Sequence, residues 1–254
     1  MRLRQMALAA RGLDAVTAQL QAVFGLSVAY NDPGIHHYGL RNAVLSAGNG
    51  FIEVVEPIRE DASAARFLNR RGGDAGYMVI LQVADAQAER ERAVALGARV
   101  VDDIDGADYR CAHFHPADFG GVLTSFDQQR TEADYLKPDG DWWPAGKAWR
   151  DAPAETGIDL LGVTLTSSDP AALARRWSDL LGQPLDAAEP LRLSLARGHV
   201  RFVAAVGANA GARLGGVDLK VADVARARRR AREAGLDVTE AGILIGGVRF
   251  RPAD

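Results

Sequence analysis

The stretch VILQVADAQAERERAVALGARV, residues 79–100, aligns without a gap with VDLKVADVARARRRAREAGLDV, residues 217–238. In each copy a strand-like run of alternating character ends at an aspartate, and a helical run follows it. Each helical run stops at a glycine, Gly97 or Gly235, which suits a left-handed C-terminal cap. The two copies predict a strand–helix unit that is used more than once in this chain.

The same outline recurs at residues 4–26 and 161–183, where a strand-like run, a turn, a helical run and a glycine follow one another. In the second of these, Asp169 and Pro170 suit the N-cap and the first helical position. Short strand-like runs separated by turn residues follow the helices, such as LSVAY, NAVLSA and FIEVVEP after the first helix. One β-α-β-β-β unit used four times accounts for the whole chain and predicts an α+β fold.

The four copies pair into two domains. Residues 1–128 form the first predicted domain, residues 158–254 form a shorter second domain, and the polar stretch 129–157 forms a linker. The linker is unusual in holding three tryptophans, Trp142, Trp143 and Trp149. These rings either attach the linker to a domain surface or cover the mouth of a ligand cleft, since aromatic side chains offer wide apolar contact.

The composition is that of a soluble globular protein, with 48% hydrophobic and 25% charged residues among 254. A formal net charge of −3 gives no electrostatic case for nucleic acid, and the basic run ARARRRAREAG is typical of a solvated helix face. The single cysteine, Cys111, excludes an internal disulfide and fits a reducing compartment. No apolar stretch approaches the ~18 residues of a membrane span. We therefore expect a cytoplasmic protein without nucleic-acid or membrane partners.

The paired β-α-β-β-β units resemble the vicinal oxygen chelate superfamily, which includes glyoxalases, extradiol dioxygenases, methylmalonyl-CoA epimerase and bleomycin-resistance binders. The first domain is most similar to the glyoxalase-like branch. The matching stretches are RQMALAARGLD at 4–14, HHYGLRNAVLSAGNGFIEVVEP at 36–57 and FHPADFGGVLTSF at 114–126. This resemblance implies that two units in each domain curl around a cleft. It also implies that FRPAD at 250–254 corresponds to FHPAD, so that the last strand of the fourth unit is missing.

The resemblance further implies a divalent metal, such as Zn, Ni, Mn or Fe, held by the first and last strands of each unit. The corresponding positions are Gln5, Glu53, Met78 and Ser125 in the first domain and Gly162, Arg201 and Gly216 in the second, where a fourth position is lacking. The second domain offers no ligand and has a structural role. In the first domain only Gln5 and Glu53 suit these metals, because a thioether such as Met78 is a poor ligand for them. A protein without metal therefore remains the alternative.

Histidines could complete the site. His113 and His115 flank Phe114 on a predicted strand, so both side chains point to the face opposite the ring, and His113 could act as a base near neutral pH. The other possibility for His115 is a hairpin-edge residue bonded to backbone. The resemblance also implies substrate contacts for His37 and Asn42, which otherwise belong to a solvated loop.

Glu53 is the main candidate for catalysis. In FIEVVEP, residues 51–57, alternation places Phe51, Glu53 and Val55 on one face of a strand. A carboxylate between apolar neighbours needs a partner if it is buried, and a metal, Gln5, a histidine or a substrate would serve. In a dry cleft its pKa would rise, and it could act as a base without metal. A charge on the wet face of a sheet is the simpler explanation.

Three functions remain open. The first is a metal-dependent lyase, isomerase or dioxygenase acting on a small carbonyl or vicinal-oxygen substrate. The second is a metal-free enzyme in which Glu53 or His113 moves a proton next to a carbonyl, with Gln5, Ser125 and the loop residues binding the substrate. The third is a non-catalytic small-molecule binding protein of the bleomycin-resistance type. A glyoxalase-like enzyme, with a homodimer as its assembly, is the leading hypothesis.

Overall fold

The computed structural model describes residues 1–205 and 211–254. It divides into two compact units. Unit 1 contains Met1–Arg4, Tyr77–Asp141 and Leu161–Leu214, and unit 2 contains Gln5–Gly76, Trp142–Leu160 and Gly215–Asp254. Both units draw on both halves of the sequence, whereas the predicted boundaries at 128 and 158 follow the repeats, and those boundaries stay a prediction. Among the described residues, no helix is long and apolar enough to cross a membrane.

Unit 2 contains the first copy of the repeat except for the start of its first strand, because the boundaries of the two units fall inside strands. Its elements are β1 (Arg2–Ala9), α1 (Leu13–Phe24), β2 (Ser27–Tyr30), the short 3₁₀ helix η1 (Pro33–Tyr38), β3 (Leu40–Ala47), β4 (Gly50–Pro57) and α2 (Ser63–Arg71). The strands lie in the order β1-β4-β3-β2, with β1 parallel to β4 and the other pairs antiparallel. This order makes β4 a central strand, so the side chains in its middle are covered on both sides by neighbouring strands.

Unit 2 also contains the fourth copy. It comprises β12 (Arg213–Lys220), α5 (Val224–Glu233), β13 (Val238–Thr239), β14 (Gly242–Ile245) and β15 (Val248–Ala253). The prediction that this copy lacks its last strand is wrong, because β15 pairs parallel with β12 and antiparallel with β14. The Gly246–Gly247 turn, with φ of 53° and 72°, joins β14 directly to β15 and shortens the copy without deleting a strand.

Unit 1 contains the second copy. Its elements are β5 (Ala75–Gln82), α3 (Ala86–Ala95), β6 (Val100–Asp105), β7 (Tyr109–Phe114), the 3₁₀ helix η2 (Pro116–Phe119) and β8 (Leu123–Gln129). The strand order is β5-β8-β7-β6. The order matches that of the first copy strand for strand, as the sequence repeat predicts.

The third copy, also in unit 1, has one strand fewer among the described residues. It comprises β9 (Asp159–Ser167), α4 (Pro170–Leu181), β10 (Arg192–Ser194) and β11 (His199–Ala204), in the order β9-β11-β10. The stretch 183–191, QPLDAAEPL, lies where the first copy has β2. Its two prolines each lack the backbone N–H that a strand pair needs, which explains why no strand forms there. The α+β fold class is confirmed, and the incomplete copy is the third rather than the fourth.

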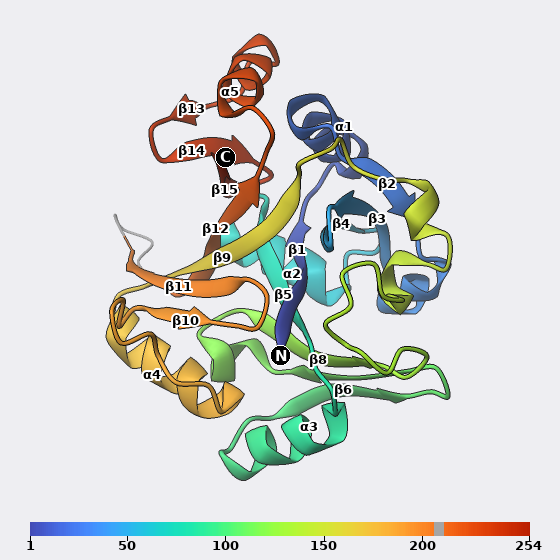
Figure 1. The fold of residues 1–254 in the computed structure, drawn as a ribbon, viewed down its shortest axis with the longest axis vertical. Helices are drawn as coiled ribbons and strands as arrows, with labels where there is room; N and C mark the ends of the chain where they lie inside the picture. The colour runs from blue at the N-terminus through green and yellow to red at the C-terminus, as the bar shows by residue number, and fades with distance from the viewer. Residues whose placement is uncertain (206–210) are drawn as a thin grey trace. The chain divides into compact units, whose positions relative to one another are not determined.

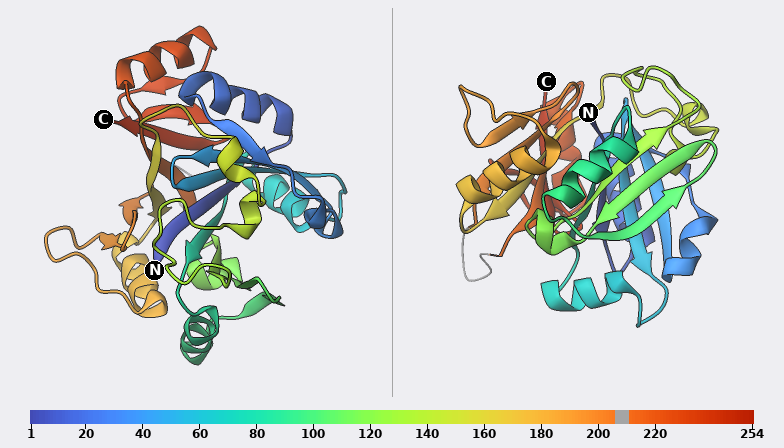
Figure 2. Two further views of the ribbon diagram at one scale, coloured as in Figure 1. Left: turned by 45° about the vertical axis from the view of Figure 1, so that its right-hand side comes forward. Right: turned by 90° about the horizontal axis from the view of Figure 1, so that it is seen from below.

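The helices of each unit pack in pairs. In unit 2, α1 lies beside α5 (Figure 1), and the rings of Phe24 and Phe250 are 5.5 Å apart between centroids. In unit 1, α3 lies beside α4 (Figure 2), and Trp177 of α4 contacts the ring of Phe119. The two helix pairs show that copies one and four share one core and that copies two and three share another.

Residues 142–152, which we call the tryptophan segment, belong to unit 2. The segment contains the 3₁₀ helices η3 (Trp143–Ala145) and η4 (Trp149–Asp151) and crosses β2 and β3 (Figure 1). Trp142 and Trp149 are buried, whereas Trp143 is 48% exposed. Two of the three linker tryptophans therefore attach this segment to the sheet of the first copy.

Candidate functional site

Glu53 lies in the middle of β4, between β1 and β3, and its residue is only 8% exposed. Its partners in the strand register are Ala7 and Val44. These apolar neighbours exclude the simple explanation of a charge on the wet face of a sheet. The structure thus places Glu53 where a carboxylate needs specific polar partners.

Two amide side chains supply these partners. Gln5 Nε2 donates a hydrogen bond to Glu53 Oε2 at 2.9 Å, and Asn42 Nδ2 donates to Glu53 Oε1 at 2.6 Å. Each carboxylate oxygen thus accepts one amide N–H. Gln5, Asn42 and Glu53, all predicted site residues, form one buried cluster in unit 2.

The orientation of both amides is fixed by donors on their other side. Trp142 Nε1 donates to Gln5 Oε1 at 2.8 Å, and the backbone N–H of Asp32 donates to Asn42 Oδ1 at 2.8 Å. An indole N–H and a backbone N–H can only donate, so each amide must present its oxygen to them and its NH₂ group to Glu53. The arrangement therefore supports an ionised carboxylate at Glu53.

The pKa of Glu53 reflects two opposing effects. Burial raises the pKa above its ordinary value, and the negative charge of Asp32 adds to this rise, whereas the hydrogen bonds from Asn42 and Gln5 lower it. Burial is the largest effect, so the net pKa is raised. A carboxylate whose pKa lies closer to neutrality is a better proton acceptor and, once protonated, a usable donor.

The same hydrogen bonds argue against a metal held jointly by Gln5 and Glu53. Gln5 turns its carbonyl oxygen to Trp142 and its NH₂ group to Glu53, so it offers no lone pair beside the carboxylate. Within the described parts of the chain, no three His, Cys, Asp or Glu side chains come together as a metal site. The donor set as folded does not fit the divalent metal that the resemblance implies.

We accordingly expect protein incubated with Zn, Ni, Mn or Fe and then desalted to retain far less than one metal ion per chain. Elemental analysis of wild type beside Glu53→Ala measures this, and the two proteins should give the same low value. Stoichiometric metal in the wild type that disappears in the variant would show that Gln5 reorients and that metal binding at Glu53 is real.

A second group of predicted residues lies in unit 1, on one face of β7 and β8. His113 is opposite Ser125 in the strand register, and Cys111 is opposite Asp127. Phe114 and Phe126 occupy the other face and pack against each other with centroids 5.0 Å apart. The alternation that placed His113 opposite to Phe114 is therefore correct.

Asp127 is the centre of this group, although the sequence had not suggested it. Its residue is 1% exposed, and its carboxylate accepts hydrogen bonds from the hydroxyl groups of Tyr109 and Ser125. Burial raises the pKa of Asp127 to about 7, against the opposing effect of the two hydroxyl donors. Ser125, which the resemblance singled out, and Asp127 are two residues apart on one strand, so alternation places both side chains on one face but does not show that Asp127 is buried.

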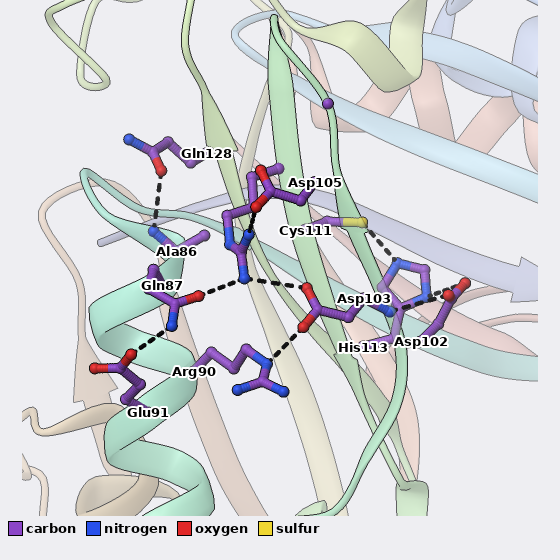
Figure 3. A network of polar contacts seen from close by, with 12 residues as sticks. Ala86, Gln87, Arg90, Glu91, Asp102, Asp103, Asp105, Cys111, His113 and Gln128 are labelled. Atoms are coloured by element: carbon purple, nitrogen blue, oxygen red, sulfur yellow. Dashed lines mark hydrogen bonds and ion pairs between the residues drawn. The ribbon is translucent and has the colours of Figure 1, made fainter.

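His113 and Cys111 extend this polar face toward β6 (Figure 3). His113 Nε2 lies 3.5 Å from Cys111 Sγ, and His113 Nδ1 lies 3.9 Å from Asp102 Oδ2. Burial lowers the pKa of His113, and the nearby Asp102 partly offsets this. Burial also raises the pKa of the Cys111 thiol well above its ordinary value. A thiol in this state is a weak nucleophile, in line with the sequence interpretation of Cys111.

The pKa of Asp127 predicts a pH-dependent stability. A carboxyl group whose folded-state pKa is raised destabilises the fold as pH increases from about 4 to about 7. The loss between pH 5 and pH 8 should be about 2–3 kcal/mol. Asp127→Asn resembles the protonated carboxyl group, so it should gain that much stability relative to wild type over this range. Denaturant unfolding at both pH values measures the difference, with the exposed Asp61→Asn as control. If the difference in unfolding free energy between Asp127→Asn and wild type were the same at pH 5 and pH 8, the pKa of Asp127 would not be raised.

Two further predicted residues have mainly local partners. His115 precedes η2, and its Nδ1 accepts a hydrogen bond from the backbone N–H of Ala117. This contact agrees with the second possibility given for His115 above, a residue bonded to backbone. His37 is exposed in η1, where its ring lies 3.5 Å from that of Tyr38. Among the described residues no hydrogen bond joins His37 to Asn42 or Glu53. Substrate contacts by His37 and His115 stay predictions.

The remaining positions of the expected metal pattern hold no cation ligand. Met78 is buried in β5, and Gly162 faces the ring of His199 across the β9–β11 pair. Since β15 exists, the fourth position of the last copy is filled by Arg251, which pairs with Asp218 at 2.5 Å. A guanidinium group at this position repels a cation, and the inability of the C-terminal half to bind a metal in this way stays a prediction. A small depression in unit 2 is lined by residues such as Glu155, Arg226 and Arg230, and by no predicted site residue.

The family model described as a glyoxalase-like domain matches residues 6–181. The ethylmalonyl-CoA/methylmalonyl-CoA epimerase of Cereibacter sphaeroides is 30% identical over 131 residues, which cover 50% of this chain and 97% of that protein. A solved structure of a hypothetical protein from Staphylococcus aureus covers 99% of both chains with a TM-score of 0.66 at 13% identity, a likeness of fold alone. A methylmalonyl-CoA epimerase variant from Streptomyces coelicolor, solved with 2-nitronate-propionyl-CoA, is 25% identical, with a TM-score of 0.45 over 51% of this chain and 94% of that chain.

Proposed function

This chain belongs to the glyoxalase-like domain family of the vicinal oxygen chelate superfamily, and from that premise we propose that it is an enzyme that moves a proton on the carbon next to a carbonyl group. The proposed base is Glu53. The observation that carries the proposal is a buried carboxylate that accepts one amide N–H on each oxygen. The oxygen of each amide in turn accepts a hydrogen bond that fixes the orientation of the amide.

The proposed reaction needs a base that begins ionised and ends protonated. Glu53 takes the proton from the α-carbon, the electrons of the broken C–H bond move to the carbonyl oxygen, and an enolate forms. Glu53 then exchanges this proton with solvent, and return of a solvent-derived proton to the same carbon completes an α-proton exchange. An isomerisation instead requires that the enolate receives a proton on its opposite face. Gln5 and Asn42 favour the ionised form at the start, while burial favours the protonated form that follows, which brings the two states closer in free energy.

The proposed substrate class is a small acyl thioester or a related carbonyl compound. The curated relative is named for ethylmalonyl-CoA and methylmalonyl-CoA, both thioesters with an acidic α-proton. The surroundings of Glu53 suit an uncharged reacting carbon, because Ala7 and Val44 flank it in the register. The proposal keeps a small carbonyl compound as the partner, while the homodimer and the cytoplasmic location stay untested predictions.

The test is loss of the α-proton in D₂O, followed by proton NMR for a panel of 2-alkylmalonyl thioesters, 2-oxo acids and 2-hydroxy acids. We expect at least one compound to exchange its α-proton faster with the protein than without it. Binding without exchange, seen as line broadening in the same spectra, would instead support the small-molecule binding protein. Neither binding nor exchange across the panel would contradict the proposed substrate class.

A further inference from the structure

The tryptophan segment covers the face of the sheet on which Glu53 lies. Trp142 is 1% exposed, and the ring of Trp149 packs on Phe51 with centroids 5.2 Å apart at an interplanar angle of 87°. Phe51 and Glu53 are two residues apart on β4, so their side chains share a face. The segment is therefore a cover over the strand that carries the proposed base.

The cover also contacts the hydrogen-bonded cluster directly. Trp142 Nε1 donates to Gln5 Oε1 at 2.8 Å, and Gln5 Nε2 donates to Glu53 Oε2 at 2.9 Å. These two hydrogen bonds connect Trp142 to the carboxylate of Glu53 through Gln5, which is 137 positions away from Trp142 in the sequence. We propose that Trp142 is a positioning residue: it fixes the Gln5 amide so that the NH₂ group, rather than the oxygen, faces Glu53. The inference deepens the proposed function and rests on it for its catalytic meaning.

The two amides differ in what holds them. Asn42 is fixed by the backbone N–H of Asp32, which no side-chain substitution removes. Gln5 is fixed by a side chain of the tryptophan segment, so its orientation depends on that segment remaining in place. A Gln5 amide turned by half a rotation would direct its oxygen at the carboxylate of Glu53, and two acceptors facing each other repel. Trp142 prevents that turn because an indole N–H has no acceptor to offer.

The consequence is a link between the cover and the base. With Trp142 in place, Glu53 is enclosed and receives two amide donors. Without the Trp142 N–H group, the Gln5 amide would lose the donor that fixes its orientation, and its hydrogen bond to Glu53 would no longer be enforced. The tryptophan segment thus enforces the second of the two amide hydrogen bonds that stabilise the charge of Glu53.

The test is Trp142→Phe, which removes the N–H group and keeps an aromatic ring. Titration of Glu53 in carboxyl-¹³C-labelled protein, followed by NMR, should show its pKa rising by about 0.5–1 unit, the equivalent of one ordinary hydrogen bond. Trp143→Phe, in the same segment but half exposed, should leave this titration unchanged. Asp32 is the titratable group that acts on Glu53 by its charge, and it is the same in all variants.

A double-mutant cycle separates positioning from mere packing. In the Gln5→Met background the amide is gone, so Trp142→Phe should shift the pKa of Glu53 no further. An equal shift in both backgrounds, or no shift in either, would overturn the proposal. The titration needs no substrate, so it decides the role of Trp142 even if no compound exchanges its proton. Conversely, exchange activity with an unshifted titration would leave Glu53 as the base and refute only the role of Trp142.

Discussion

Replacing Glu53 by glutamine is expected to lower the rate of α-proton exchange by about 10²–10⁴-fold, the usual contribution of a positioned general base. The substitution keeps the size and shape of the side chain and removes only its ability to accept a proton. Because Gln5 and Asn42 both present NH₂ groups to this position, glutamine can accept from one of them and must face the other with its own NH₂ group. Initial exchange rates in D₂O with the best compound of the panel measure the effect.

The matched control is Glu56→Gln. Glu56 lies on the same strand, is half buried and pairs with Arg41 at 2.6 Å, so the substitution has a similar chemical effect at a site away from the cluster. We expect its exchange rate to stay within about twofold of wild type, because surface ion pairs contribute little. Equal losses in the two variants, with both proteins folded, would remove Glu53 from the proposed role.

Trp177→Ala is expected to destabilise the protein by about 3–5 kcal/mol, the range found for large aromatic residues removed from a core. Trp177 is fully buried in α4 and its ring lies 5.3 Å from that of Phe119 and 6.0 Å from that of Phe202. Its indole N–H also donates to the backbone oxygen of Phe119 at 3.1 Å, which the substitution leaves without a partner. Urea unfolding followed by circular dichroism measures the loss.

This variant tests whether the third copy belongs to the core of unit 1. The control is Trp143→Ala, since Trp143 is about half exposed and its removal opens no comparable cavity. A loss below about 1 kcal/mol for Trp177→Ala, or an equal loss for the control, would indicate that α4 packs independently of the second copy.

The fold could be predicted because its signals are local. The aspartates and glycines that punctuate the repeat have the expected roles: Asp85 and Asp223 accept hydrogen bonds from the first turns of α3 and α5, and Gly97 and Gly235 have φ of 84° and 71°. Each of these depends on a few neighbouring residues. The count of strands in the last two copies was less accessible, because a proline-containing loop replaces one strand of the third copy, whereas a tight glycine turn shortens the fourth copy and keeps all of its strands.

The candidate site could be predicted only in part. The resemblance and the alternation along one strand together pointed to Glu53. The resemblance also gave Gln5 and Asn42, which the structure brings together with Glu53. Neither signal carries the direction of an amide group. The direction of the Gln5 amide depends on Trp142, which is far away in the sequence. Because of this direction, Gln5 donates a hydrogen bond to Glu53, although it was predicted to be a metal ligand. Asp127 was missed for a different reason, since a carboxylate near a strand end is usually solvated and only the fold buries it.

The pH dependence of α-proton exchange, set beside the NMR titration of Glu53 in the same protein, tests the central claim most directly. If Glu53 is the base, the acidic limb of the rate profile of the free enzyme and the titration of Glu53 must share one midpoint, above the ordinary glutamate value. A rate profile whose midpoint follows another group, while Glu53 titrates elsewhere, would contradict the account.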